Sequence, residues 1–200
     1  MKGPLFYAKI LLFGEYGIIK DSKGLAIPFN AYKGALKKKN ILTKEAKKSN
    51  QNLNKFYLYL ASLNTDIVVF NLSALKTDIA EGMYFDSSIP QGYGVGSSGA
   101  LVASIYDKYV SDKITVLENL TRDKLLSLKE IFSLMESFFH GKSSGLDPLN
   151  SYLSLPLLIN SKTNIEPAGI PSQKQGKGAV FLLDSEQIGE TEPMVTIFMD

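Results

Sequence analysis

Short apolar and aromatic runs bounded by turn residues recur along the chain, a pattern typical of β-strands. The predicted strands cover residues 4–13, 25–36, 66–72 and 82–87, and further short strands after residue 153 include 178–184 and 194–199. Gly14 and Gly17 indicate a tight turn after the first run. The lysine-rich and asparagine-rich segment 37–52 predicts a solvated loop, because no aromatic side chains interleave its lysines.

Three other segments predict helices, because their apolar side chains return every three or four positions. They are residues 53–63, the segment from residue 101 to 109, and residues 121–139. Thr121 is the predicted N-cap of the last helix, and Gly141 is its predicted end.

The composition narrows the class of protein. The 200 residues are 44% hydrophobic and 21% charged, which is ordinary for a globular protein, and the net charge of +2 argues against nucleic-acid binding. The chain has no cysteine, which excludes a disulfide scaffold, a thiolate metal site and a cysteine nucleophile. Lys9 and Glu15 interrupt the first apolar stretch, and no run approaches the roughly 18 apolar residues of a membrane span. We therefore expect a cytoplasmic protein without a signal peptide or a membrane partner.

The segment of residues 92–100, GYGVGSSGA, is the strongest local signal for chemistry. Its closely spaced glycines let the backbone approach a ligand, and its serines stand where a helix begins, a position that favours an anion such as phosphate. The spacing matches neither the Walker A pattern nor the dinucleotide fingerprint. The alternative is a flexible glycine-rich turn capped by Ser97.

Polar residues near the end of the last predicted helix form a second signal. Glu136 and His140 share one helix face, and Asp147 lies just beyond it. Glu136 with Ser98 would suit Mg²⁺, which leaves Asp147 free to orient a substrate hydroxyl. The alternative is a surface pair plus an aspartate that caps the helix starting at Pro148.

Lys9 stands in an otherwise apolar predicted strand, where it needs an anionic partner or a route to solvent. Asp147 is a candidate partner, and a lysine beside it would add positive charge where phosphate charge develops. The alternative is a lysine at the strand edge that reaches water.

Three motifs, in this order, resemble the GHMP kinase superfamily, and within it the mevalonate kinases most closely. Residues 8–16, AKILLFGEY, are similar to the family's first motif, and residues 90–100 are similar to its phosphate loop, P-x-x-x-G-L-G-S-S-A. Residues 140–147, HGKSSGLD, resemble the signature H-G-x-P-S-G-x-D, with Glu136 eleven residues before Asp147. With the elements between the motifs, the resemblance covers essentially the whole chain.

The resemblance implies a fold and a set of roles. It implies an α+β fold like the GHMP kinase N-terminal domain (ribosomal protein S5 domain 2-like), with a mixed or antiparallel sheet backed by helices. Mg²⁺ would be held by Ser98 and Glu136, with Asp147 as the catalytic base and Lys9 beside it. The ATP phosphates would be bound by Pro90, Gly92, Gly94, Gly96, Ser97, Ser98 and Gly99. The substrate would lie near Glu15, His140, Ser144 and Gly145.

The chain departs from the family pattern at several positions. Val95 replaces the usual leucine, and Gly99 replaces the usual alanine. Ser143 stands where mevalonate kinases commonly carry proline, and this replacement mostly affects the stiffness of the loop. The glycine-rich motif of the family's C-terminal domain has no counterpart, and residues 194–199 form an apolar run up to the last residue. We therefore expect an N-terminal ATP-binding domain over residues 1–155 and the start of a truncated C-terminal region over residues 156–200.

The expected activity is phosphorylation of an alcohol by ATP, with mevalonate converted to 5-phosphomevalonate for isoprenoid precursors. Phosphomevalonate kinase, homoserine kinase and a non-catalytic nucleotide-binding relative remain alternatives, although retention of all four polar side chains (Lys9, Ser98, Glu136 and Asp147) argues against the last. Diphosphomevalonate decarboxylase has a different first motif, and the sugar-binding signature of galactokinase is missing. The oligomeric state stays open, although the family often forms homodimers.

Overall fold

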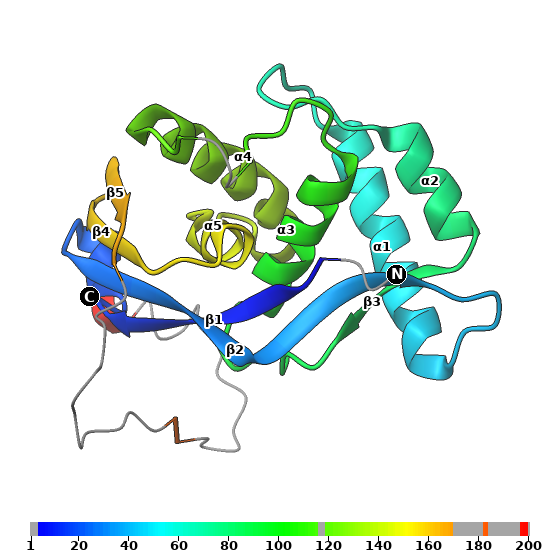
Figure 1. Ribbon diagram of the computed structural model, residues 1–200, viewed down its shortest axis with the longest axis horizontal. Helices are drawn as coiled ribbons and strands as arrows, with labels where there is room; N and C mark the ends of the chain where they lie inside the picture. The colour runs from blue at the N-terminus through cyan, green and yellow to red at the C-terminus, as the bar shows by residue number, and fades with distance from the viewer. Residues whose placement is uncertain (1–3, 116–118, 170–181, 184–196, 200) are drawn as a thin grey trace.

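The computed structural model describes residues 4–115, 119–169, 182–183 and 197–199. Within these residues five strands form one antiparallel sheet, and the long helices lie together against one of its faces (Figure 1). The predicted α+β fold, with an antiparallel sheet backed by helices, is confirmed.

A single long strand organises the sheet. The strands are β1 (Phe6–Phe13), β2 (Gly24–Lys38), β3 (Met83–Ser87), β4 (Leu157–Ser161) and β5 (Asn164–Pro167). β1 pairs along one side of β2, while β3 and β4 pair with its two ends on the other side and β5 extends from β4. β1 is therefore an edge strand, so backbone groups on its outer side are available to the loops that follow it.

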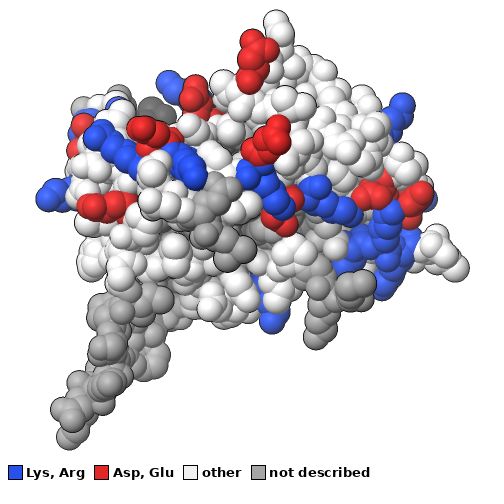
Figure 2. All heavy atoms as spheres, turned by 45° about the horizontal axis from the view of Figure 1, so that its top comes forward, with Lys and Arg blue, Asp and Glu red and all other residues white. Residues whose placement is uncertain are grey.

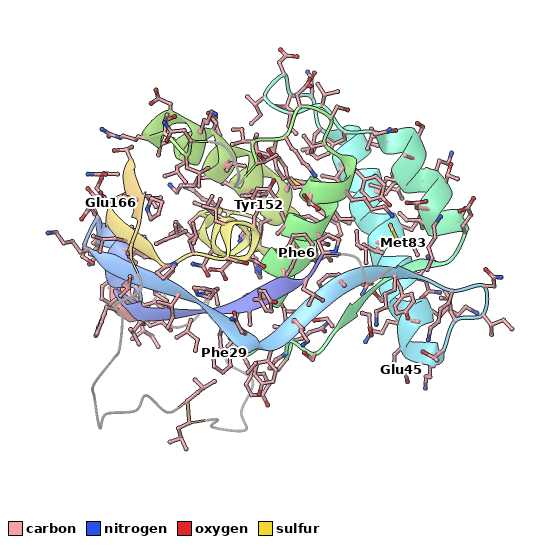
Figure 3. All side chains as sticks on the ribbon, viewed as in Figure 1. Phe6, Phe29, Glu45, Met83, Tyr152 and Glu166 are labelled. Atoms are coloured by element: carbon pink, nitrogen blue, oxygen red, sulfur yellow. The ribbon has the colours of Figure 1, made fainter. Side chains whose placement is uncertain are left out.

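The helices bury a shared apolar layer over the sheet. They are α1 (Lys44–Ser62), α2 (Leu72–Ala80), α3 (Ser97–Tyr109), α4 (Arg122–His140) and α5 (Leu146–Leu153), with a short 3₁₀ helix, η1 (Gly17–Lys20), after β1. At the centre, the rings of Tyr106, Phe132 and Tyr152 meet edge to face with centroids 4.9–5.6 Å apart. Figure 3 shows Tyr152 within this helical layer and Met83 where β3 meets α1.

The predicted ends of α4 are confirmed. The Thr121 hydroxyl accepts a hydrogen bond from the Lys124 N–H at 3.3 Å, and Gly141 ends the helix with a φ of 68°. Asp147 does not cap the next helix, because Gly145 is the N-cap of α5 and Asp147 lies in its first turn.

Two sequence predictions between β2 and α3 are wrong. Residues 66–72 do not form a strand: only Phe70 makes an isolated bridge, to Val110, and Asn71 caps α2 instead by accepting from the Ala74 N–H. Segment 37–52 is not a loop, since β2 extends to Lys38 and α1 begins at Lys44. The first turns of α1 bury only one side chain, Ala46, so helical spacing was not visible there.

Strand predictions near the end of the chain fall mainly on residues outside the described ones. Residues 157–161 and 164–167 are strands, as expected after residue 153. Within the predicted strand 194–199, the described residues 197–199 are helical, so that part of the prediction is wrong. Residues 182–183, inside the predicted strand 178–184, also lack strand structure.

Charged side chains of both signs are interspersed on the face drawn in Figure 2. At the end of β2, Lys37 pairs with Asp86, and Lys38 pairs with Asp78 and Glu81. No helix in the described part of the chain has the length and apolar character needed to cross a membrane.

Candidate active site

Lys9 is buried in β1 and is held at both its backbone and its side chain. Its N–H donates to the carbonyl of Val95 at 3.0 Å, across the outer edge of the strand. Its ammonium group lies 3.0 Å from Asp147 Oδ1 in α5. The Lys9 side chain is 11% exposed and that of Asp147 is 34% exposed, so the carboxylate is the member of the pair that solvent can reach.

The loop of residues 90–96, called the glycine loop below, carries the chain from β3 into α3. Gly92, Gly94 and Gly96 all have positive φ, between 67° and 80°, a conformation that other residues adopt only with strain. At Gly96 a Cβ atom would lie 3.0 Å from Lys9 Cγ and 3.8 Å from Asp147 Oδ2. The glycine loop therefore lies directly against the Lys9–Asp147 pair.

The start of α3 and the start of α5 are also in close contact. A Cβ atom on Gly99 would come within 2.7 Å of the Asp147 carbonyl carbon and 2.8 Å of the Pro148 nitrogen. Figure 1 shows α3 and α5 side by side over the sheet. Only glycine at position 99 permits this approach, which brings Asp147 to the N-terminal end of α3.

Ser98 connects this end of α3 with α4. Its hydroxyl donates to Glu136 Oε1 at 3.1 Å and lies 3.0 Å from His140 Nε2. Because the hydroxyl hydrogen is used on Glu136, His140 Nε2 is the donor in the second contact. Glu136 is 2% exposed, whereas His140 is exposed at the end of α4.

The electrostatics of these groups are shifted by burial and by one another. Burial lowers the pKa of Lys9, but the charge and hydrogen bond of Asp147, and then the charges of Glu15 and Glu136, outweigh it and raise that pKa above its ordinary value. Burial and the Asp147 charge raise the pKa of Glu136 to about 7, against the hydrogen bonds from Ser143 and Ser98. The removal of this carboxylate from water is the largest cause, and the positive charge of Lys9 offsets it only in part.

The remaining predicted residues have different surroundings. Pro90 is the first residue of the glycine loop, and Ser97 follows the loop as the first residue of α3. Glu15 is exposed in the turn after β1, and its charge acts on Lys9. The Ser144 hydroxyl accepts a hydrogen bond from the N–H of Leu146, the first residue of α5, at 3.3 Å. Gly145 faces α4, because a Cβ atom there would lie 2.2 Å from the Lys129 carbonyl oxygen.

Three serines to which the sequence analysis gave no role in the site hold it together. Ser143 donates to Glu136 Oε2, Ser133 donates to the Ser143 carbonyl at 2.6 Å, and Ser151 of α5 donates to the Tyr7 carbonyl of β1 at 2.8 Å. Serines are common at turns and on helices, so nothing in the sequence marked these three as contacts between distant elements.

The oxygen atoms of Ser98 and Glu136 are suited to Mg²⁺. They lie 3.1 Å apart, which is close to the spacing of about 3.0 Å between adjacent corners of an octahedron with metal–oxygen distances of about 2.1 Å. Across the part of the chain that the structure describes, no three His, Asp or Glu side chains gather as metal ligands. Such a site would draw its other ligands from phosphate and water, which is usual for Mg²⁺.

Comparison with known proteins found similarity to solved structures but not to sequence families. No protein-family model and no curated protein sequence matches the chain. The structure is similar to L. major mevalonate kinase in complex with R-mevalonate (TM-score 0.47, 18% identity, 84% of this chain and 55% of that chain). It is also similar to Methanococcus jannaschii mevalonate kinase (TM-score 0.49, 15% identity, 84% of this chain and 56% of that chain). A third similar structure is the mevalonate kinase from methicillin-resistant Staphylococcus aureus (TM-score 0.43, 21% identity, 82% of this chain and 53% of that chain). The chain spans about half the length of these mevalonate kinases, and the similarity is one of fold.

Proposed function

We propose that the chain is the ATP-binding part of a kinase that transfers the γ-phosphoryl group of ATP to an alcohol. The observation that carries this proposal is the convergence of two polar pairs on the glycine loop. Lys9 and Asp147 lie 3.0 Å apart on one side of it, and Ser98 and Glu136 lie 3.1 Å apart at the start of α3. Phosphoryl transfer depends mainly on positioning and on neutralising phosphate charge, so this set is chemically sufficient.

The glycine loop and the N-terminus of α3 bind the phosphates of ATP in this account. Unpaired N–H groups and the positive end of the helix dipole favour an anion there. The positive φ values of Gly92, Gly94 and Gly96 support a backbone that curves around phosphate oxygens without side chains in the way. The hydroxyl groups of Ser97 and Ser98 supply further donors.

Ser98 and Glu136 would hold Mg²⁺. The metal would neutralise charge on the phosphates and orient them for in-line transfer. His140 Nε2 lies 3.0 Å from the Ser98 oxygen in this structure and would help to orient the serine side chain.

Asp147 receives or orients the proton of the substrate hydroxyl, and Lys9 stabilises the charge on the transferred group. A carboxylate that is 34% exposed can be reached by a substrate, whereas the buried ammonium group is held in place by its partner. Lys9 stays protonated because its pKa is raised, so its positive charge is available throughout the reaction.

Mevalonate is the proposed acceptor, because residues 140–147 resemble the mevalonate kinase signature H-G-x-P-S-G-x-D. Exposed Glu15 and His140 lie at the border of the site, where a small hydroxy acid would be recognised. We propose further that residues 1–155 form the ATP-binding domain and that a C-terminal domain completes the acceptor site.

A coupled ADP-release assay tests this proposal on the purified protein, including any coding sequence that follows Asp200. The assay supplies ATP and Mg²⁺ with mevalonate, phosphomevalonate, homoserine or galactose. We expect turnover with mevalonate, and a decrease in kcat of roughly 10²–10⁴-fold in Asp147→Asn with ADP affinity little changed. ATP binding without turnover on any of these alcohols would refute the acceptor and favour a non-catalytic relative.

A further inference from the structure

The turn of residues 141–145, between α4 and α5, is tied to α4 at three points. Ser133 Oγ donates to the Ser143 carbonyl at 2.6 Å, and Ser143 Oγ donates to Glu136 Oε2 at 2.5 Å. At the third point, Gly145 lies so close to the α4 backbone that a Cβ atom would be 2.6 Å from the Ser133 nitrogen. The turn therefore cannot shift along α4 without breaking side-chain hydrogen bonds or colliding with the helix.

The Ser143 hydroxyl is the part of this turn that contacts the candidate metal site. It donates to Glu136 and accepts from the Gly145 N–H at 3.1 Å, so both its hydrogen and a lone pair are used. The two oxygens of the Glu136 carboxylate are thus held from opposite sides, Oε1 by Ser98 and Oε2 by Ser143. Two donors on different elements fix the plane of the carboxylate as well as its position.

We propose that Ser143 is a positioning residue that orients the Glu136 carboxylate toward the glycine loop and keeps it in register with Asp147. The position of Glu136 relative to Asp147 is fixed through the chain itself. Ser143 accepts from the N–H of Gly145, the N-cap of α5. Asp147 lies in the first turn of that helix. Proline, which the similar signature carries at this position, has no hydroxyl and could make neither bond. This inference rests on the proposed function, since it assigns Glu136 to the metal.

A purely structural role for Ser143 makes a different prediction. A serine that accepts from the N–H two residues later stabilises a turn wherever it occurs. In that case its removal would lower stability without changing the orientation of Glu136. The two roles are therefore separated by a measurement on the metal site rather than by a measurement of folding.

The test uses Mn²⁺ as a spectroscopic substitute for Mg²⁺. Electron paramagnetic resonance measures how tightly Mn²⁺ binds to the protein in saturating ADP. We expect Ser143→Ala to weaken Mn²⁺ affinity by roughly 10–100-fold, the usual cost of losing a group that orients a metal ligand. ADP affinity without metal is expected to stay the same, because the glycine loop is untouched. Ser143→Thr keeps the hydroxyl and is expected to restore most of the Mn²⁺ affinity.

Ser137→Ala is the matched control. Ser137 lies one residue from Glu136, and its hydroxyl donates only to the Ser133 carbonyl of the same helix, at 2.7 Å. Its loss is expected to leave Mn²⁺ affinity unchanged. Mn²⁺ affinity in Ser143→Ala equal to that of the wild type, or an equal loss in Ser137→Ala, would overturn the inference while leaving the proposed function intact.

Failure of the proposed function gives a different result, because the wild type would then not bind Mn²⁺ in the presence of ADP. The position of Glu136 is in that case read from crystal structures of the wild type and Ser143→Ala. A carboxylate that turns away from Ser98 in the variant supports the positioning role. A carboxylate that keeps its contact with Ser98, at 3.1 Å in the present structure, contradicts it.

Discussion

At the scale of single residues, the two members of the Lys9–Asp147 pair differ in their access to water. The Lys9 side chain is 11% exposed, and the Asp147 side chain is 34% exposed. Removing Asp147 therefore leaves a buried ammonium group without its partner, whereas removing Lys9 leaves a carboxylate that water can still solvate. The cost of breaking an ion pair depends on which charge remains buried.

This difference in exposure predicts which of two substitutions lowers the free energy of unfolding more. We expect Asp147→Asn to lower the free energy of unfolding by roughly 1–3 kcal/mol, less than for a fully buried pair because Asp147 is partly solvated. Lys9→Met, which replaces the buried cation with an apolar side chain of similar length, is expected to cost less than about 1 kcal/mol. Urea denaturation at neutral pH measures both, and a larger loss in Lys9→Met would contradict the account.

At the scale of elements, Asp78 joins α2 to β2 and α3. Its carboxylate lies 2.6 Å from the Lys38 ammonium group of β2 and 2.7 Å from that of Lys108 in α3, and it accepts from the Tyr109 hydroxyl at 2.6 Å. Burial would raise the pKa of Asp78, but these three donors outweigh it and hold that pKa well below its usual range. The pairs tie together elements that meet at the far end of β2 from the glycine loop.

The pH dependence of stability follows from the direction of this shift. Because the pKa of Asp78 is lower in the folded chain, its contribution is present above the unfolded pKa of about 4 and is lost as pH falls below it. Asp78→Asn is expected to lower the free energy of unfolding by roughly 1–3 kcal/mol at pH 7, with a smaller difference from the wild type in strong acid. Urea denaturation at several pH values measures this convergence.

Asp86→Asn provides the control for Asp78. Asp86 pairs with Lys37, and both side chains are about half exposed (49% and 54%), so its removal is expected to cost at most about 1 kcal/mol at neutral pH. Equal effects of the two substitutions at pH 7 would show that the Asp78 pairs add no more than a surface ion pair does.

The contact between α3 and α5 is a second feature at the element scale. A Cβ atom on Gly99 would meet backbone atoms of α5 at 2.7 and 2.8 Å, so the helix that carries Asp147 would have to move. We expect Gly99→Ala to lower stability by roughly 1–3 kcal/mol and to lower turnover as well, measured by urea denaturation and by ADP release. Gly169→Ala is expected to change neither, because no atom of the described residues outside its chain neighbours lies within 4 Å of the added Cβ.

At the scale of the whole molecule, the candidate site is formed by residues far apart in the sequence. Lys9, Ser98, Glu136 and Asp147 come from β1, α3, α4 and α5, and the Lys9–Asp147 and Ser98–Glu136 contacts span 138 and 38 residues. The helices lie on one face of the sheet, and the edge position of β1 lets its backbone bond to the glycine loop (Figure 1). The site depends on this architecture rather than on any one segment.

The sequence predicted those helices and strands in which the spacing of apolar residues matches the side chains that are buried. β1, β2, β3 and α4 were expected within a few residues of their bounds, because each presents apolar side chains to the core. The start of α1 and the whole of α2 were missed. The helical structure of those segments depends more on capping residues and on packing against other elements than on the spacing of apolar residues. The glycine loop was expected as a loop leading into a helix, which is where it lies.

The sequence indicated some of the contacts between elements at the site but not others. Lys9 and Asp147 were expected to be partners on chemical grounds, and the structure brings them within 3.0 Å. Ser143 was interpreted only as a change in loop stiffness, because its bond to Glu136 exists only after the 141–145 turn folds back on α4. Gly99 was noted only as a replacement of the family's usual alanine, although the approach of α5 depends on it.

The central claim, transfer of a phosphoryl group from ATP to an alcohol, is tested most directly with ATP labelled at the γ-phosphate. The purified protein, with any coding sequence beyond Asp200, is incubated with Mg²⁺, labelled ATP and mevalonate, and the products are separated. The account predicts label on the alcohol in the wild type and its loss in Asp147→Asn. Label that stays in ATP or appears only in inorganic phosphate would contradict the claim.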